Sequence, residues 1–508
     1  MDGQTRRGFL RAGAAGTAAA GGAAGAQGRT GEECGSVWQR PPKQQGNNLN
    51  LVLLVSDTFR ADNLACYGSK WVECPELNRL AEESVIFEDA YPEGMPTIPI
   101  RRTLMTGRRI LPFYYHRQHE PVQLPGWHEL YNEDVTLSET LREAGYLCAL
   151  HADIPHMQRP GKNFHRGYHH YEWVRGHEAD SYATAPRKMQ DFSALYPAAY
   201  MELPEIRESL PRFLNQYIAN RERWRQLGES LVELTAKNAM AWLRQNHQQA
   251  PFFLHVEAFD PHEPWDPPRS FLEKYLRDPS GHEWPEPPYA DVTVPPEGVK
   301  RMRANYAGEA SSVDYWFGRI LETLRDLKLT DNTLIMFLAD HGALLGEQGQ
   351  FLKGPARLRT QVTHIPLLVR LPRREMAGRR VKGFVQIPDL MPTLLGRLGL
   401  KPPSRCTGAD IWPLATGQTH SLKEYVVQAY GWIAAVRTPE WNYTRAWRPA
   451  KLPQPFAPQL YDCRRDPEEL VNVAEKYPEE AKKLSAMLDE YMASGEALTR
   501  GSFHERAA

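Results

Sequence analysis

The sequence predicts an α/β fold in which a large, mostly parallel β-sheet lies between layers of helices. Three short apolar runs, at 49–55, 252–256 and 333–338, carry this prediction. Polar residues follow each run, as is typical of buried parallel strands that place polar groups at their carboxyl ends. Stretches with helical spacing separate the runs, which is what crossover connections between parallel strands require.

The other elements follow in chain order. Thr136 and Glu139 form a capping box that starts one helix, and Gly145 ends it. The segment 186–228 predicts a mixed, partly helical insertion, and the proline-rich segment 284–296 predicts an excursion over the surface. We expect further strands at 85–87, 146–150 and 365–370, and helices from Pro75 onward and at 136–145, 231–243, 306–327 and 385–400.

Composition limits the classes of function. The chain has 508 residues and a formal net charge of −1, which suits two or three domains or one large α/β unit. It has no basic block, zinc-finger spacing or Gly-rich phosphate loop, so nucleic acid is not an expected partner. Its six cysteines form no CxxC pair, which argues against a cysteine zinc site. Cys66 and Cys74 either pair in an oxidising compartment or stay free.

The N-terminus predicts a targeting segment. Residues 5–11, which contain Arg6-Arg7, resemble the twin-arginine export signal, and Ala24-Gly25-Ala26 offers a small-residue cleavage site. We therefore expect a mature protein that begins near Gln27 and is periplasmic or secreted through the twin-arginine pathway. The alternative is a flexible tail with a chance pair of arginines. No other stretch is long and apolar enough to predict an integral membrane span.

One segment, 95–108, suits chemistry on an anion. Pro99 fits the first turn of a helix, and Gly107 fits its C-terminal end. Thr97 is then expected just ahead of the helix N-terminus, where free N–H groups and the helix dipole favour anions. Arg101 lies one helical turn further on, where its guanidinium reaches the same anion.

Polar residues at the ends of two predicted strands suit a metal ion. Asp57 and Thr58 follow the run 49–55, and Asp340 and His341 follow the run 333–338. In open α/β sheets the carboxyl edge of the strands holds the ligand site. Hard oxygen ligands with one imidazole suit calcium, manganese, magnesium or zinc and do not choose among them.

Together these segments resemble the sulfatase family of the alkaline phosphatase superfamily. Thr97 stands where sulfatases carry Cys or Ser, Arg101 matches the motif arginine, and Thr106-Gly107-Arg108 closes the motif. The resemblance covers about residues 48 to 490. Further matches are Asp57 with the following 60–62 and 66–68, Asp260-Pro261-His262, Asp340-His341-Gly342, Gly346-Glu347 and Lys353-Gly354.

The resemblance implies a role for each matched residue. Thr97 is implied as the nucleophile, Arg101 and Lys353 as the groups that hold the anion, and His262 as the group that serves the leaving oxygen. His156 and Arg175 are implied substrate contacts, with a structural hydrogen bond as the alternative for each. The implied metal ligands are Asp57, Thr58, Thr97, Asp340 and His341. The implied cofactor is one divalent metal ion, calcium by family, with manganese, magnesium or zinc as alternatives.

Two departures from the family pattern matter. Most sulfatases carry Gly-Lys-Trp-His after the strand at 146–150, whereas this chain has 151–156 without the lysine, and only His156 loosely matches the histidine. The second departure is Thr97 itself. A threonine cannot become formylglycine by the family's route, so no formylglycine is expected. A threonine hydroxyl can still attack in line, and the resulting ester is hydrolysed readily when it is a phosphate ester.

Three functions remain open from the sequence. The first is a metal-dependent hydrolase of sulfate or phosphate-type esters, including phosphodiesters and phosphonate monoesters. The second is a phosphoryl or sulfuryl transferase. The third, from another class, is an inactive pseudo-sulfatase that binds an anionic ligand. The expected substrate is a small-molecule or glycan anionic ester, and the oligomeric state is left open.

The resemblance also implies the domain organisation. The segments 435–438, 441–443 and 459–462 resemble the small antiparallel sheet that, with a terminal helix, ends sulfatase chains. We expect a twin-arginine signal peptide at 1–26, a linker at 27–47, a sulfatase-like catalytic domain at 48–415, a small C-terminal subdomain at 416–495 and a tail at 496–508.

Overall fold

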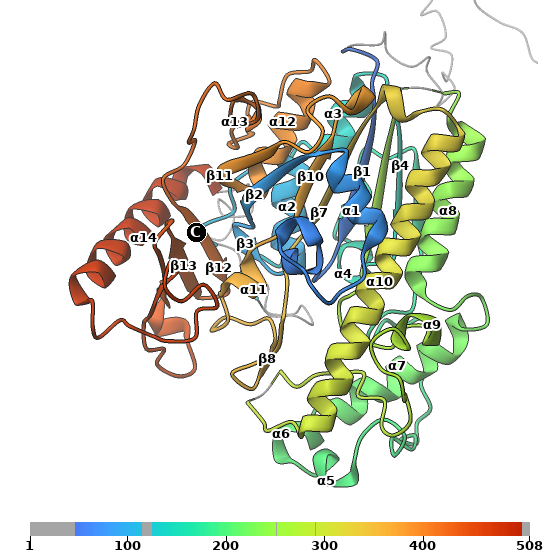
Figure 1. Ribbon diagram of the computed structural model, residues 1–508, viewed down its shortest axis with the longest axis vertical. Helices are drawn as coiled ribbons and strands as arrows, with labels where there is room; N and C mark the ends of the chain where they lie inside the picture. Colours follow the sequence, from blue (N-terminus) through green and yellow to red (C-terminus); the bar gives the residue numbers. More distant parts are fainter. Residues whose placement is uncertain (1–45, 114–123, 250, 290, 500–508) are drawn as a thin grey trace, which may run out of the picture. The chain divides into compact units, whose positions relative to one another are not determined.

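An eight-stranded sheet organises the computed structural model, which describes residues 46–113, 124–249, 251–289 and 291–499 (Figure 1). All neighbouring strands run parallel except β10, which is antiparallel to both of its neighbours. The prediction of a large, mostly parallel sheet is confirmed. In spatial order the strands are β11 (Arg380–Gln386), β2 (Val85–Tyr91), β10 (Leu367–Arg370), β7 (Thr333–Ala339), β1 (Asn50–Ser56), β6 (Phe252–Ala258), β4 (Leu147–Ala152) and β5 (His170–Trp173).

The three apolar runs that predicted the fold form the middle of this sheet. Strand β1 pairs with β6 on one side and with β7 on the other, and every residue of the three strands is buried. Such strands have no face exposed to solvent because helices cover both sides of a parallel sheet. Their carboxyl ends therefore meet inside the protein, at a place that solvent does not reach freely.

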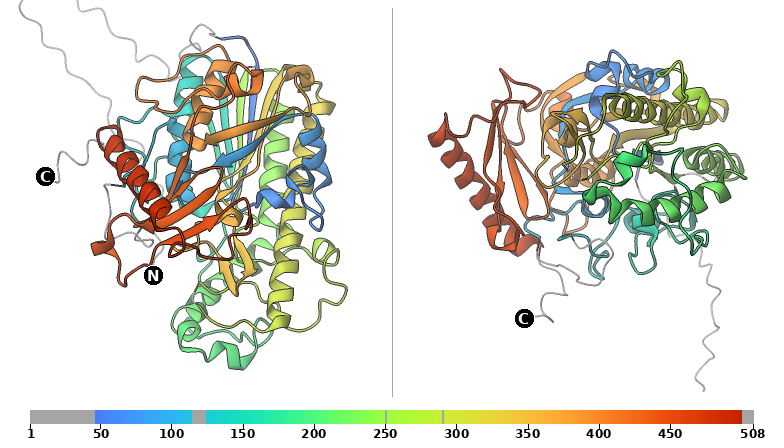
Figure 2. Two further views of the ribbon diagram at one scale, coloured as in Figure 1. Left: turned by 60° about the vertical axis from the view of Figure 1, so that its left-hand side comes forward. Right: turned by 90° about the horizontal axis from the view of Figure 1, so that it is seen from below.

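Helices cover both faces of the sheet (Figure 2). On one face α8 (Leu231–Asn246) packs against α10 (Pro296–Asp326), which also contacts α1 (Pro75–Glu82). On the other face α2 (Thr97–Thr106) contacts α3 (Leu137–Glu143), α4 (Pro155–Gln158) and α12 (Leu390–Arg397). The shorter helices are α5 (Ala198–Met201), α6 (Pro204–Arg207), α9 (Arg269–Leu272), α11 (Thr360–Thr363) and α13 (Trp412–Thr416), and the predicted insertion also contains α7 (Leu210–Trp224).

Local sequence signals were confirmed at several helix ends. The Thr136 side chain accepts from the Glu139 amide at 3.1 Å, and the Glu139 carboxylate accepts from the Thr136 amide at 2.9 Å, which completes the capping box. Gly107 ends α2 in the left-handed region, with a φ of 61°. Cys66 and Cys74 are both free thiols, so the alternative of a disulfide between them is excluded in this structure.

Two predicted helix boundaries were wrong. Helix α10 starts at Pro296, ten residues before the expected position 306, because a proline at the first helical position costs no hydrogen bond and presets the backbone. The expected helix at 385–400 begins only at Leu390, since residues up to Gln386 complete the edge strand β11. A continuous apolar run does not distinguish a strand from a helix.

The small C-terminal sheet is present, as the resemblance implied. Four antiparallel strands, β12 (Val426–Tyr430), β13 (Ile433–Arg437), β14 (Trp441–Ala446) and β15 (Gln459–Asp462), pack against α14 (Pro478–Thr499). A fifth strand, β3 (Gly94–Met95), joins β12 in parallel. Because β3 lies directly before Thr97, the small sheet holds the segment that carries the candidate nucleophile.

The predicted signal peptide at 1–26 and its cleavage site lie outside the described residues, as do most of the linker at 27–47 and residues 500–508 of the tail. The boundary at 415/416 stays a prediction. Among the residues that the structure describes, no helix combines the length and apolar character needed to cross a membrane.

Candidate active site

Three side chains meet where the central strands end. Asp57 directly follows β1, and Asp340 and His341 directly follow β7. One ligand atom from each residue lies within 4.8 Å of the others, and all three side chains are fully buried. The parallel pairing of β1 with β7 explains this meeting, because it brings both carboxyl ends to the same edge of the sheet.

The protonation of His341 can be worked out from its partner. Its Nδ1 lies 2.9 Å from the Gly342 carbonyl oxygen, which can only accept, so Nδ1 carries the proton. Its Nε2 therefore carries a free lone pair. This nitrogen lies 3.8 Å from Asp57 Oδ1 and 3.7 Å from Asp340 Oδ2. Among the described residues, Nε2 has no hydrogen-bond donor, and Asp57 Oδ2 has only the ion-pair contact with Arg101. Buried acceptors with this arrangement fit a metal ion, and the Gly342 contact is the usual outer support of a ligating imidazole.

The charges around Arg101 also fit a divalent cation. The guanidinium Nη1 lies 3.1 Å from Asp57 Oδ2, Nη2 lies 2.9 Å from Glu257 Oε2, and Nη1 also pairs with Asp340. All four side chains are fully buried. Three carboxylates against one guanidinium leave a formal excess of two negative charges, and a buried charge is costly unless it is compensated.

The pKa values of the two aspartates shift in opposite directions. Burial and the neighbouring Asp340 raise the pKa of Asp57 well above its usual range, against the attraction of Arg101. Burial acts in the same direction on Asp340, but Arg101 and His341 outweigh it and lower the pKa of Asp340. A cation in this place would stabilise both carboxylates in their charged form.

Thr97 is the first residue of α2 rather than a residue just ahead of it, because Pro96 takes the capping position. The Thr97 side chain is buried, and Arg101 lies four residues on, on the same side of the helix. Thr97 therefore faces the same region as the Arg101 ion pairs. Helix α2 contributes free N–H groups in its first turn, which favour an anion there.

Thr58 supports the two aspartates directly. Its amide donates to Asp340 Oδ1 at 2.9 Å, and its hydroxyl donates to Asp57 Oδ1 at 2.8 Å. Its backbone adopts a φ of 59°, a left-handed conformation that a β-branched residue rarely takes. Two carboxylate contacts hold this conformation. The ligand role of Thr58 stays a prediction.

His262 and Lys353 form a buried pair. Lys353 Nζ lies 2.6 Å from His262 Nε2 and 2.8 Å from Glu263 Oε1. His262 Nδ1 lies 2.7 Å from the Glu263 carbonyl oxygen, so Nδ1 is the donor and Nε2 accepts from Lys353. Burial and the charge of Lys353 lower the pKa of His262 well below its usual value. In this arrangement Lys353 Nζ donates to the lone pair of His262 Nε2.

His156 joins this pair, whereas Arg175 lies apart. His156 Nε2 is 3.2 Å from Glu178 Oε2, and Glu178 Oε1 is 4.0 Å from His262 Nδ1. Burial alone would raise the pKa of Glu178, but His156 and His262 lower it to about 2. Arg175 instead pairs with Asp180 at 2.7 Å, packs over Trp173 and is 37% exposed.

Sequence reasoning missed the acidic residues that hold the predicted cations. Glu257 lies within β6, one residue beyond the predicted run 252–256, and Glu263 directly follows His262 in the motif. Glu178 lies three residues after Arg175, and no pattern in the sequence marks it as a partner of His156. A glutamate at the end of a buried strand is a signal in the sequence, because a buried carboxylate needs a charged or hydrogen-bonding partner.

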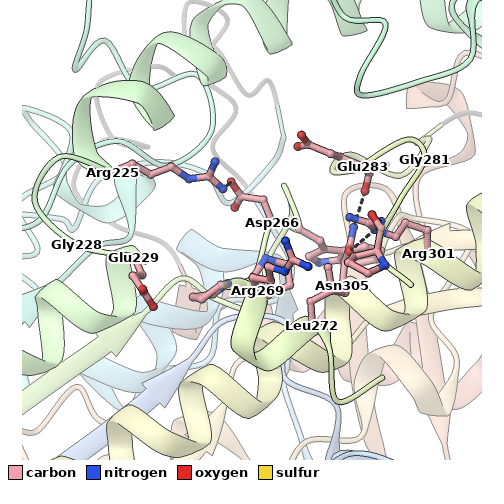
Figure 3. A pocket seen from close by; sticks show the side chains of 14 residues that line it. Arg225, Gly228, Glu229, Asp266, Arg269, Leu272, Gly281, Glu283, Arg301 and Asn305 are labelled. Atoms are coloured by element: carbon pink, nitrogen blue, oxygen red, sulfur yellow. Dashed lines mark hydrogen bonds and ion pairs between the residues drawn. The ribbon is translucent and has the colours of Figure 1, made fainter. Parts of the chain in front are cut away.

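A separate cavity of about 510 Å³ lies beside the insertion (Figure 3). On its wall Asp266, from the loop that carries His262, forms an ion pair with the Arg225 guanidinium at 3.3 Å. Asn305 and Arg301 of α10 line the other side. None of the predicted site residues lines this cavity.

This fold, with its buried site at the carboxyl edge of the sheet, is that of the alkaline phosphatase superfamily, and the chain is an ester-bond hydrolase. Within that class it belongs to the sulfatase family. The Sulfatase family model matches residues 49–400, and the model for the C-terminal part of N-sulphoglucosamine sulphohydrolase matches residues 346–496.

Relatives and solved structures of both ester chemistries resemble the chain. An arylsulfatase of Clostridium perfringens is 23% identical over 86% of this chain and 93% of its own length. An N-acetylgalactosamine-6-O-sulfatase of Bacteroides thetaiotaomicron is 25% identical over 90% and 95%. The crystal structure of a phosphonate monoester hydrolase of Agrobacterium radiobacter covers 88% of this chain and 96% of its own, with a TM-score of 0.65 at 22% identity.

Proposed function

We propose that the protein is a metal-dependent hydrolase of sulfate or phosphate-type esters that uses Thr97 as a covalent nucleophile. One observation carries this proposal. Arg101, one turn after Thr97 on α2, pairs with Asp57 and Asp340, which lie with His341 in a single buried group. The nucleophile segment and the anionic group therefore belong to one site.

A divalent cation held by Asp57, Asp340 and His341 would supply Lewis-acid chemistry, and oxygen ligands with one imidazole suit calcium, manganese, magnesium or zinc. Calcium is the metal we expect from the family. The protein's own groups divide the remaining work. The Thr97 hydroxyl attacks sulfur or phosphorus, Arg101 stabilises the negative charge of the transferred group, and water later hydrolyses the threonine ester.

The Lys353–His262 pair serves the leaving oxygen. Because His262 Nδ1 is bonded to a carbonyl and Nε2 accepts from Lys353, the mobile proton of this pair is on the lysine. The leaving oxygen takes that proton, and the neighbouring Glu263 carboxylate, 2.8 Å from Nζ, compensates the lysine charge beforehand. This refines the expectation that His262 serves the leaving oxygen.

Thr97 favours phosphorus over sulfur. The family's formylglycine hydrate releases sulfate without attack of water on sulfur, and a threonine lacks that route. A threonine phosphate is hydrolysed readily, and a phosphonate monoester hydrolase is among the structures that share this fold. Phosphodiesters and phosphonate monoesters are therefore the favoured substrates, with phosphoryl transfer to an alcohol as the second candidate. The alternative substrate is a glycan ester, because a relative is named as an N-acetylgalactosamine-6-O-sulfatase.

The buried charge argues against an inactive anion-binding protein. Asp57, Asp340 and Glu257 place three carboxylates around one guanidinium, and a protein that only bound an anion would gain nothing from that excess. The site is therefore better suited to a cation together with an anionic substrate.

The test is a substrate panel with Thr97 variants. Aryl sulfates, phosphate monoesters, phosphodiesters and phosphonate monoesters are assayed with each divalent metal. Thr97→Ala is expected to lose several orders of magnitude in kcat while it keeps its metal and fold, and Thr97→Ser is expected to retain activity. Thr103→Ser, a change elsewhere in α2, is the matched control. Parent-like turnover by Thr97→Ala on the best substrate would refute the nucleophile.

We also propose export through the twin-arginine pathway, on the basis of Arg6-Arg7 and the cleavage site before Gln27. N-terminal sequencing of the protein recovered from the periplasm or medium of its native host is expected to begin near Gln27. An intact N-terminus on cytoplasmic protein would contradict this.

A further inference from the structure

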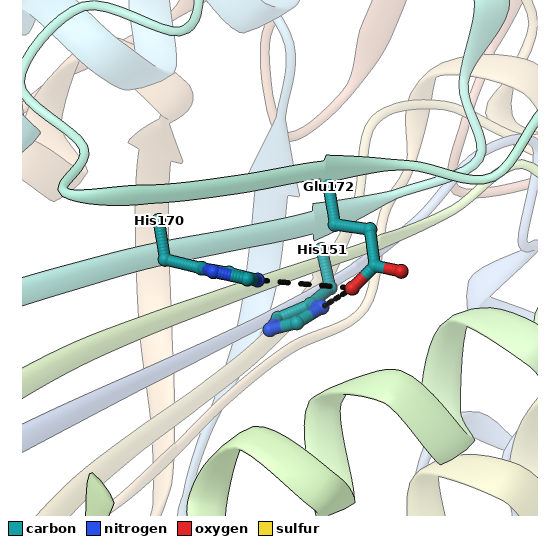
Figure 4. A group of neighbouring side chains, drawn as sticks. All are labelled: His151, His170 and Glu172. Carbon is teal, nitrogen blue, oxygen red and sulfur yellow. Dashed lines mark ion pairs between the residues drawn. The ribbon is translucent and has the colours of Figure 1, made fainter.

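We infer that the protein has a second metal site, made by His151, His170 and Glu172, which takes a zinc-type transition-metal ion. It lies on the edge pair of the large sheet, between β4 and β5, and shares no residue with the candidate active site. Figure 4 shows both imidazoles directed toward the same oxygen of the Glu172 carboxylate.

The sheet register brings these three side chains together. His151 of β4 and Glu172 of β5 are direct partners in the parallel ladder, and His170 lies two residues before Glu172, on the same face of β5. His151 Nδ1 is 3.3 Å and His170 Nε2 is 3.7 Å from the same oxygen, Glu172 Oε2. One ligand atom of each residue lies within 4.8 Å of the others. Tetrahedral bonds of about 2.0–2.2 Å give ligand separations of this size.

The histidine nitrogens of this group make no hydrogen bonds to residues outside it in the part of the chain that the structure describes. Among the described residues, Nδ1 and Nε2 of His151 and Nε2 of His170 have no hydrogen-bond partner, although only 1% of the His151 side chain is exposed. A buried imidazole without partners is costly. Either ring nitrogen of His151 can offer a lone pair to a metal ion. A bound metal would satisfy this nitrogen.

A neighbouring side chain from helix α8 positions the carboxylate. Asn238 Nδ2 donates to Glu172 Oε1 at 2.7 Å, which turns Oε2 toward the two histidines. Trp242 of the same helix lies edge-on to the His151 ring, at 6.4 Å between ring centres, and covers its inner side. Metal ligands are usually held in this way by a hydrogen bond from outside the coordination sphere.

The ligand set selects the kind of metal. Two imidazoles and one carboxylate suit zinc and its neighbours cobalt, nickel and copper, whereas calcium prefers an all-oxygen shell. His170 and Glu172 are each about two-fifths exposed, at 42% and 41%, so solvent can complete the coordination. The chemistry of this site therefore differs from that of the oxygen-rich group around Asp57.

The position of the site suggests what the metal does. Strand β5 is an edge strand, held only by β4 on its inner side. Glu178 lies six residues after Glu172 in the chain. It pairs with His156 and lies near His262. A metal ion bound between β4 and β5 would hold β5 in place. It would thereby also hold the segment after β5, which carries Glu178 into the candidate active site. The role is thus structural support of the substrate-facing segment.

The test is metal binding, measured without reference to catalysis. Full-length protein is stripped with a chelator and titrated with Co²⁺ and Zn²⁺, with bound metal counted after dialysis and Co²⁺ bands recorded by absorption. His170→Ala and Glu172→Gln are each expected to bind one equivalent of zinc less than the parent. Asn238→Ala is expected to keep the site with about 10- to 100-fold weaker affinity. His247→Ala, on a half-buried histidine at the end of α8, is the control and is expected to match the parent.

A second background separates the two sites. Asp340→Asn removes a carboxylate of the candidate active site and leaves β4 and β5 untouched, so it is expected to keep the zinc equivalent that His170→Ala loses. The second site is refuted if His170→Ala binds as much Zn²⁺ as the parent with the same affinity. It is also refuted if the parent binds a single equivalent that Asp340→Asn abolishes. If Asp340→Asn keeps both this zinc and the catalytic rate of the parent, the proposed function is overturned and the second site stands.

Discussion

Removal of the metal that we propose for the active site is expected to destabilise the protein measurably. The structure places Asp57, Asp340 and Glu257 around one guanidinium in a fully buried group, so the folded state gains from a divalent cation that the unfolded chain does not bind. A metal present at 1,000 times its Kd stabilises by about 4 kcal/mol. A chain of 508 residues unfolds with an entropy of about 1 kcal/mol/K, at about 2.1 cal/mol/K per residue. Chelation is therefore expected to lower the apparent Tm by about 4 °C.

The assay is thermal unfolding with and without chelator, followed by re-addition of each divalent metal. Asp57→Asn is the informative variant. Without metal it is expected to be at least as stable as the chelated parent, because burial and Asp340 already outweigh the attraction of Arg101 for the Asp57 carboxylate. It is also expected to gain little when metal is added. Equal chelator-induced shifts in Asp57→Asn and the parent, or no shift with any divalent metal, would refute the charge argument.

Two further predictions concern the proton carrier and the acid limit of stability. Lys353→Met is expected to lower kcat by about 10²- to 10³-fold with a smaller change in KM, since it removes the charge and proton beside His262; unchanged kcat would contradict this. Burial would raise the pKa of Glu139, but hydrogen bonds from Arg166 and Thr136 outweigh it and lower this pKa. The charged carboxylate therefore stabilises the fold at pH values above its unfolded pKa of about 4.5. That contribution is lost as the pH falls through the folded pKa. Chemical unfolding at pH 3 to 7 is expected to show a flatter profile for Glu139→Gln than for the parent, and identical slopes would count against it.

The sequence alone determined the features that rest on local patterns. The three apolar runs predicted the central strands because a fully buried parallel strand is apolar on both faces. The capping box at Thr136 and the glycine end of α2 followed from the hydrogen-bond needs of helix termini. The motifs at 95–108, 260–262 and 340–342 carried the resemblance to the sulfatase family, which the family match to residues 49–400 confirmed.

Tertiary structure decided which distant groups became partners. Glu257 and Arg101 are 156 positions apart in the chain, and only the parallel pairing of β6 with β1 brings this glutamate to the guanidinium. The partner of Lys353 is a histidine rather than solvent, and β3 joins a sheet made otherwise from residues beyond 425. Periodicity and capping report on neighbours within a few residues, whereas a sheet register fixes contacts across the whole chain. For that reason the residue types of the site could be predicted from the sequence, but their charge balance and proton positions depended on the fold.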